Sequence, residues 1–183
     1  RHELARFFSD RRAVHVYALA DLDDRYWASS QWYRRDDAVV GLVGLPDGTE
    51  LACYAVATRD TGATLELLAD LAPSLPPGQL VTGPVGTAEA LSPRAVRWSA
   101  PHTRFELVDP GALPPPDEQV EPLARADLDD LLGLYAVEAD AAFFLPHMLH
   151  DDTFVGVRDG DGRLVASAGT HVVSTEHRVA AIG

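Results

Sequence analysis

The sequence contains no lysine, so all 15 of its basic residues are arginine. A chain without lysine has no Schiff-base nucleophile, no lysine general base and no phosphate loop of the kind that requires a lysine. The single cysteine, Cys53, excludes an internal disulfide, and its place in an apolar run predicts a buried, unreactive thiol. Several chemistries are therefore excluded before any motif is considered.

Long apolar runs are also missing, since no segment approaches the ~18 to 20 apolar residues that a membrane helix needs. Residues 1–12 lack the apolar stretch of a signal peptide, although a chain that begins at Arg1 is expected to have lost residues upstream. The net charge of −13 argues against a nucleic-acid partner, because proteins that bind nucleic acid carry clustered positive charge. We therefore expect a cytoplasmic protein with no membrane or nucleic-acid partner.

What the sequence does contain is typical of a folded protein, with 46% hydrophobic and 23% charged residues. Consecutive prolines between Pro110 and Asp117 cannot continue a helix or donate to a central sheet, so they predict an extended linker. We expect an N-terminal α/β domain over residues 1–109, a Pro-rich linker over residues 110–118 and a C-terminal part over residues 119–183.

The N-terminal part alternates between helical and strand patterns, which predicts a small α/β domain. Apolar runs at residues 38–45 and 51–57, separated by Pro46-Asp47-Gly48, predict a β-hairpin. The aromatic and arginine residues of the stretch 25–35 are expected in core and cation–π packing, or in an interface between the two halves. The other expected elements are helices around residues 4–8, 14–22 and 63–71, a short strand at 79–82 and a longer strand at about 96–108.

The C-terminal part has a clearer pattern of elements. Asp127 is expected to cap a helix whose buried stripe consists of Leu128, Leu131, Leu132 and Tyr135. A short strand at residues 119–123 precedes this helix, and a second short helix is expected over residues 138–145. A hairpin of residues 153–158 and 164–174 turns at two Asp-Gly pairs, and a last strand covers residues 178–182. The expected fold class is α/β (α+β), a mixed and mainly antiparallel sheet flanked by helices.

The run from Phe154 to Ser174, Phe-Val-Gly-Val-Arg-Asp-Gly-Asp-Gly-Arg-Leu-Val-Ala-Ser-Ala-Gly-Thr-His-Val-Val-Ser, is followed by Val-Ala-Ala-Ile-Gly at residues 179–183. With the expected element order, this run resembles strands two to four of a GCN5-related N-acetyltransferase (GNAT) domain. The resemblance rests on the Asp-Gly turn and on the small residues Ala168 and Gly169. The stretch Val14–Asp23 also resembles the divergent half that precedes the catalytic half in two-part members.

The resemblance implies an enzyme, an acyl-CoA-dependent N-acetyltransferase that moves an acetyl or other acyl group from acetyl-CoA to a primary amine of a small molecule or peptide. In that family the fourth strand offers free backbone N–H groups to the thioester, which places Ala181, Ile182 and Gly183 at the cofactor. The Arg/Gln-x-x-Gly-x-Gly/Ala loop that binds the pyrophosphate is absent. The natural polypeptide is therefore expected to continue beyond Gly183, and the catalytic base and acid stay unassigned.

In the same family, the loop between the first two helices lines the acceptor pocket, which places Phe143, Phe144 and His147 at the substrate. His171, in the third strand, is a further substrate-side candidate because imidazole titrates near neutral pH. The alternative in each case is structural, namely core packing or an ordinary surface histidine. His147 and His150 have the spacing of metal ligands, but no nearby Cys or His completes a set of four, so no metal is predicted.

Two other functions stay open. A non-catalytic GNAT-fold module would use the N-terminal part for ligand sensing or dimerisation, so a homodimer is also left open. An unrelated α/β enzyme would have its site within residues 1–110, and a ligand mapped to those residues alone would support it.

Overall fold

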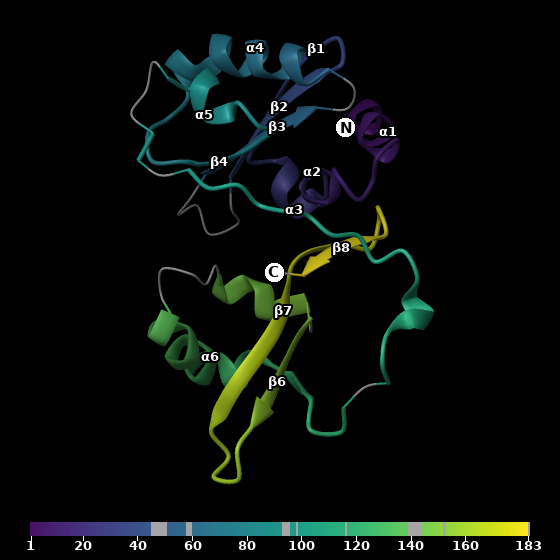
Figure 1. Cartoon of the computed structure of the whole chain (residues 1–183), viewed down its shortest axis with the longest axis vertical. Coiled ribbons are helices and arrows are strands. Elements are labelled where there is room, and N and C mark those ends of the chain that lie inside the picture. The colour runs from purple at the N-terminus through teal and green to yellow at the C-terminus, as the bar shows by residue number, and fades with distance from the viewer. Residues whose placement is uncertain are drawn as a thin grey trace. The chain divides into compact units, whose positions relative to one another are not determined.

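The computed structural model describes residues 1–44, 51–57, 60–92, 96–97, 99–115, 117–138, 144–151 and 153–182. The chain divides into two compact units, Arg1–Phe105 and Glu106–Gly183, called here the N-terminal unit and the C-terminal unit. Each unit has its own four-stranded, mostly antiparallel sheet with flanking helices (Figure 1), so the expected fold class is confirmed. Among the described helices, none combines the length and the apolar character that a membrane crossing requires.

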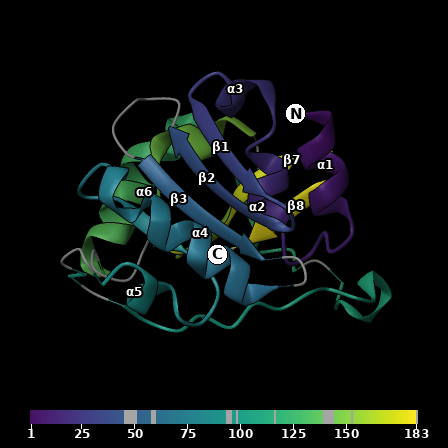
Figure 2. The ribbon, with the colours of Figure 1, turned by 90° about the horizontal axis from the view of Figure 1, so that it is seen from above.

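The sheet of the N-terminal unit has the strand order β1-β2-β3-β4, and β1, β2 and β3 lie side by side in Figure 2. The first three strands pair antiparallel, whereas β3 and β4 pair in parallel because α4 connects them. The elements of this unit are α1 (His2–Ser9), α2 (Val16–Ala20), α3 (Asp24–Trp27), β1 (Ser30–Arg35), β2 (Ala38–Gly44), β3 (Leu51–Ala57), α4 (Thr61–Leu71), η1 (Ala72–Ser74), β4 (Leu80–Thr82) and α5 (Thr87–Ala90).

Both faces of β2 are covered, since all seven of its residues are buried. Val40 and Leu42 belong to the core cluster that includes Leu68 of α4. On the opposite face, Tyr54 of β3 stacks on Tyr17 of α2 with the ring centroids 6.2 Å apart. Figure 1 accordingly shows α4 and α2 on opposite sides of this sheet. Helices on both faces explain why β2 is a continuous apolar run.

Two local predictions for the N-terminal unit are confirmed. The hairpin is the antiparallel pair β2–β3, although its expected turn, Pro46-Asp47-Gly48, lies outside the described residues. The expected helix of residues 63–71 is α4, which begins two residues earlier than predicted. It begins there because the Asp60 carboxylate accepts a hydrogen bond from the Ala63 N–H at 3.1 Å.

One prediction for this unit needs an addition and another needs correction. In the stretch 25–35 the expected core and cation–π packing is present, since Tyr26 is buried and the Arg25 guanidinium lies 5.0 Å from its ring centroid, but the sequence did not predict the strand β1 that follows. The strand expected at about residues 96–108 is wrong, since no described residue of that stretch is in a strand. Phe105 and Val108 are 89% and 84% exposed, so these apolar side chains pack against neither sheet.

The C-terminal unit builds a second sheet, with the strand order β5-β6-β7-β8 and antiparallel pairing throughout. The hairpin expected from the two Asp-Gly pairs is β6–β7, and β8 is the expected last strand. The elements of this unit are η2 (Pro110–Ala112), β5 (Glu121–Leu123), η3 (Arg125–Asp127), α6 (Leu128–Tyr135), η4 (Ala136–Glu138), η5 (Pro146–Asp151), β6 (Phe154–Arg158), β7 (Leu164–Ser174) and β8 (Val179–Ile182).

The core of the C-terminal unit lies on one face of its sheet. Phe154 is 2% exposed and packs in a cluster with Leu131 of α6 and Leu149 of η5. Its ring covers Gly169 so closely that a Cβ there would lie 2.2 Å from the ring. On the other face, Val155 is 37% exposed and its cross-strand partner Ala168 is exposed as well.

Arg158, at the end of β6, joins the first elements of the C-terminal unit. Its guanidinium donates to carboxylates of Glu121, Asp127 and Asp130 at 2.7, 2.5 and 2.6 Å. It also donates to the Gly162 carbonyl at 3.0 Å. A planar fork of donors can hold several acceptors at once, so one side chain links β5, the start of α6 and the β6–β7 turn.

Several details of this unit differ from expectation. The Asp127 carboxylate does not cap α6, because it accepts from the Ala124 N–H at 2.8 Å. Leu132 is 45% exposed, so it leaves the predicted buried stripe. The linker is not extended throughout, because the Asp109 carboxylate accepts from the Gly111 N–H and stabilises the η2 turn. The helix expected over residues 138–145 falls mainly on residues 139–143, outside the described part of the chain.

Candidate functional site

Three residues predicted to be functional come together where β7 pairs with β8. Ala181 pairs with Val172 and Ile182 pairs with Thr170, so His171 is the extra residue between the two pairs. A register shift of this kind is a β-bulge, which changes the direction of a side chain and often accompanies functional sites. His171 is half-buried there. Gly183, the third residue expected at the cofactor, lies outside the described residues.

One edge of β8 pairs with β7, and its other edge pairs with no strand among the described residues. Along such an edge, alternate residues direct their backbone N–H and C=O groups away from the sheet. The strand reads Val-Ala-Ala-Ile, and Ala180 and Ala181 have side chains small enough to leave the backbone accessible. Ile182 is 84% exposed. This edge therefore offers backbone hydrogen-bond donors that pair with no strand among the described residues, and His171 lies on β7, across β8 from that edge.

The predicted substrate residues of the helix–helix loop lie elsewhere in the unit. Phe144 stacks on Tyr135 at a centroid distance of 5.3 Å and meets Phe154 edge-on at 5.4 Å, so its ring packs against the core. His147 is half-buried in η5, directly before the buried Met148. Phe143 lies outside the described residues. These ring contacts agree with the alternative in which Phe144 packs against the core and does not line a substrate site.

The N-terminal unit contains a polar cluster around the buried Asp21 that the sequence did not predict, called the Asp21 cluster and made of Tyr17, Asp21, Tyr54 and Arg104. Both tyrosines are half-buried and Arg104 is exposed. Asp21 follows the last residue of α2 and is 3% exposed, and its Oδ2 accepts no hydrogen bond. Tyr17 and Tyr54 stack beside it. The Arg104 guanidinium lies 5.3 Å from the Tyr17 ring centroid and donates to the Val14 carbonyl.

Burial shifts the pKa values in and around this cluster. Desolvation, and secondarily the charge of Asp23, raises the pKa of Asp21 to about 8, against a smaller opposing effect of Arg25. Desolvation also raises the pKa values of Tyr17 and Tyr54 above that of an ordinary tyrosine. The Asp21 charge adds to both tyrosine shifts, which places these three side chains close together.

His15, which precedes α2, is buried in the same region of the N-terminal unit. It is 3% exposed, and its Nε2 has no hydrogen-bond partner. Desolvation, followed by the charges of Arg11 and Arg104, lowers the pKa of His15 to about 4. The imidazole is therefore neutral at physiological pH.

The sequence did carry one signal for this cluster. Tyr17 and Asp21 are four residues apart within the apolar run from Val14 to Leu22, so a helix places both polar groups on one face. That face had to be the buried one, because the residues around them are apolar. Tyr54 carried no such signal, since it lies within a uniformly apolar strand.

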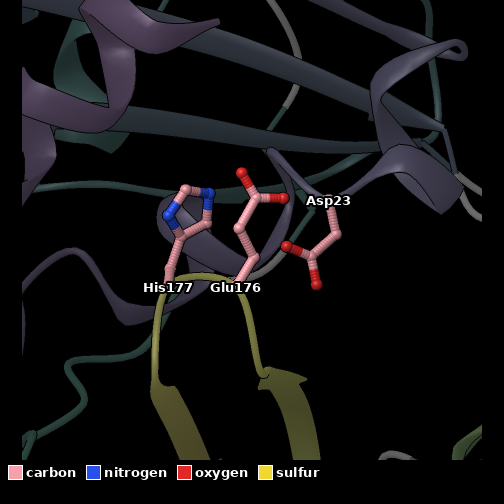
Figure 3. Close-up of side chains that lie close together, drawn as sticks. All are labelled: Asp23, Glu176 and His177. Carbon is pink, nitrogen blue, oxygen red and sulfur yellow. The ribbon is translucent and has the colours of Figure 1, made fainter.

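Figure 3 draws three side chains of types that bind metals, Asp23, Glu176 and His177. Asp23 precedes α3 in the N-terminal unit, whereas Glu176 and His177 belong to the β7–β8 turn of the C-terminal unit. The C-terminal unit therefore supplies only two of these three side chains, Glu176 and His177. A zinc site needs three or four protein ligands. In this turn the Ser174 hydroxyl accepts from the His177 N–H at 3.0 Å. The side chains of His150 and Asp151, and all of Asp152, lie outside the described residues.

Comparison with known proteins adds no relative to these observations. No family model matches the chain, and neither a curated protein nor a solved structure matches it. Functional inference for this chain therefore depends on its own residues and on the arrangement of its strands.

Proposed function

We propose that this chain is part of an acyl-CoA-dependent N-acetyltransferase that acts on a primary amine of a small molecule or peptide. The observation that supports it best is the register of β7 and β8, which puts Ala181, Ile182 and His171 at one place beside an unpaired strand edge. The order of elements in the C-terminal unit, a strand and a helix followed by three antiparallel strands, agrees with the resemblance to a GNAT domain.

The donors at this place suit a thioester carbonyl. Attack by an amine puts negative charge on the carbonyl oxygen, and a fixed backbone N–H directed at that oxygen stabilises it. The free edge of β8 supplies such N–H groups, and the methyl side chains of Ala180 and Ala181 do not block the approach. The proposal assigns the thioester end of the cofactor to these residues and makes no assignment for its phosphates.

In the proposed transfer the acceptor amine nitrogen bonds to the thioester carbonyl carbon of acetyl-CoA, and the C–S bond breaks. Coenzyme A leaves as a thiolate, and the proton that the amine loses balances it as the free thiol. An ammonium ion must lose its proton before its nitrogen can attack, so the reaction needs a base or a route for that proton. His171 is half-buried at the bulge beside β8, and we propose that it orients the acceptor amine or takes its proton.

The test is titration of the chain with acetyl-CoA by isothermal calorimetry, using two proline variants of β8. Of the neighbouring residues Ala180 and Ala181, one directs its N–H outward and the other into the ladder with β7. Proline removes the N–H in either case, but it disrupts the sheet only where the N–H is bonded to β7. The variant that keeps the circular dichroism of the wild type should bind acetyl-CoA about tenfold more weakly, the effect of losing one hydrogen bond.

Coenzyme A without an acyl group is the matched ligand control, because it lacks the thioester carbonyl. Its affinity should be the same for the wild type and for the folded proline variant. Equal loss of both ligands would mean that proline disturbs the site rather than removing one donor. If the wild type binds neither ligand, the enzyme assignment of this chain is wrong, and a non-catalytic module for ligand sensing or dimerisation becomes the better interpretation.

A further inference from the structure

The Asp21 carboxyl is placed where a negative charge is poorly stabilised. Its side chain is 3% exposed, and its Oδ2 has no hydrogen-bond partner. It stands at the C-terminal end of α2, which is the negative end of the helix dipole. A buried polar atom without a partner costs free energy, and a buried unpaired charge costs much more.

The charged and titratable groups around Asp21 come from several elements of the N-terminal unit. Tyr17 lies one turn before it on α2, and Tyr54 reaches it from β3. Asp23 adds a second negative charge, and Arg25 of α3 opposes it. Arg104, from residues 99–105, which form no helix or strand, interacts with both tyrosines. Among the contacts described, no cation forms an ion pair with the carboxyl itself.

We propose that Asp21 is a proton-dependent element of the N-terminal unit, which folds with a neutral Asp21 carboxyl and loosens around α2 and α3 when that proton is lost. The neutral acid needs no counter-charge in an apolar site, whereas the carboxylate must either draw in water or move toward it. Movement of Asp21 would separate α2 from β3, because Tyr17 and Tyr54 pack between them. A rise to alkaline pH should therefore weaken the packing of α2 on β3.

The sign of the effect follows from proton linkage. The pKa of Asp21 in the folded unit, about 8, is above its ordinary value of 3.8. The folded state therefore binds more protons than the unfolded state between these values, and stability falls as the pH rises toward 8. His15 has the opposite slope between about pH 4 and its ordinary 6.5. The two effects oppose each other below pH 6.5, so the Asp21 effect is isolated between pH 6.5 and 8.

The experiment measures urea unfolding of the chain between pH 6 and 9 by tryptophan fluorescence. The C-terminal unit has no tryptophan in its sequence, so tryptophan emission follows the N-terminal unit, in which Trp27 and Trp32 are described. The unfolding constant of the wild type should rise by up to about tenfold per pH unit between pH 6.5 and 8, as expected for one proton. Asp21→Asn, which is neutral at every pH, should abolish this rise.

Glu66→Gln is the matched control, because it is also an acid-to-amide change but on the exposed face of α4. It should keep the slope of the wild type. An Asp21→Asn slope equal to that of the wild type would overturn the proposal, and so would a wild type without any slope in this window. If Asp21→Asn does not fold, carbon-13 NMR of the wild-type carboxyl decides the matter, since ionisation of Asp21 below pH 5 would contradict the proposal.

Discussion

The two sheets of this protein have the same number of strands but are buried differently. The sheet of the N-terminal unit has α4 on one face and α2 on the other, and every residue of its strand β2 is buried (Figure 1). The sheet of the C-terminal unit has its core cluster on one face, and its strands β6 and β7 mix buried with exposed residues. A strand covered on both faces is a continuous apolar run, whereas a strand covered on one face alternates between apolar and polar residues.

This difference teaches where each unit should be sensitive to substitution. In the C-terminal unit, neighbouring residues of one strand should respond very differently, because successive side chains point to opposite faces. In the N-terminal unit both faces of the central strand β2 should be sensitive. Four predictions test or sharpen this comparison.

The largest effect is expected for Phe154→Ala, on the covered face of the C-terminal sheet. Phe154 is 2% exposed and contacts Phe144 and the space above Gly169. Removal of its ring leaves a cavity and should cost about 3–5 kcal/mol of the free energy of unfolding. Far-UV circular dichroism in urea measures the loss, while tryptophan emission reports the N-terminal unit separately. A cost below ~1 kcal/mol would mean that this cluster is not the core of the unit.

A smaller effect is expected at two glycines that lie under aromatic rings, one in each unit. An added Cβ would lie 2.2 Å from the Phe154 ring at Gly169 and 2.5 Å from the Trp32 ring at Gly41. Phe154 is enclosed and cannot move aside, whereas Trp32 is only half-buried. Gly169→Ala should therefore cost about 1–3 kcal/mol, and Gly41→Ala less than Gly169→Ala. Thermal or urea unfolding of both variants tests the ranking, which equal costs would contradict.

A pH-dependent effect of similar or smaller size is expected from His15 of the N-terminal unit. Its pKa of about 4 is below the ordinary 6.5, so the folded state binds fewer protons and stability should fall as the pH falls from 6.5 to 4. In the wild type Asp21 opposes this change. The loss should appear in Asp21→Asn and disappear again in the double variant with His15→Gln, as measured by tryptophan emission in urea. A loss that persists in the double variant would assign it to other groups.

The sequence predicted the elements of this fold well wherever one local pattern decided them. The apolar runs of β2 and β3, the Asp-Gly turns of β6–β7 and the helical apolar spacing of α4 are patterns of this kind. The prediction failed for residues 96–108. Their apolar composition favours a strand, but the described residues of this stretch pair with neither sheet. Pairing between distant segments is not encoded in the segment itself.

The candidate site residues show the same limit. Ala181, Ile182 and His171 were chosen from a resemblance, and their grouping beside a bulge could not have been read from the sequence, because a one-residue shift in register leaves composition unchanged. The Asp21 cluster was missed for a different reason. Its arginine and one of its tyrosines come from distant segments, and only the folded unit brings Tyr54 and Arg104 to α2.

The smallest effect is expected for Val155→Lys, on the exposed face of the C-terminal sheet. Val155 follows Phe154 directly but points the other way and is 37% exposed. Its neighbours across the strands, Pro122 and Ala168, are exposed too, so a lysine stem can lie over them with its charge in water. The cost should stay within about 0.5 kcal/mol, as for ordinary surface substitutions. Val155→Thr, which keeps the β-branched shape, separates strand preference from burial. If lysine costs several times more than threonine, this face is covered in the natural protein, and the difference between the two sheets becomes a difference in what covers them.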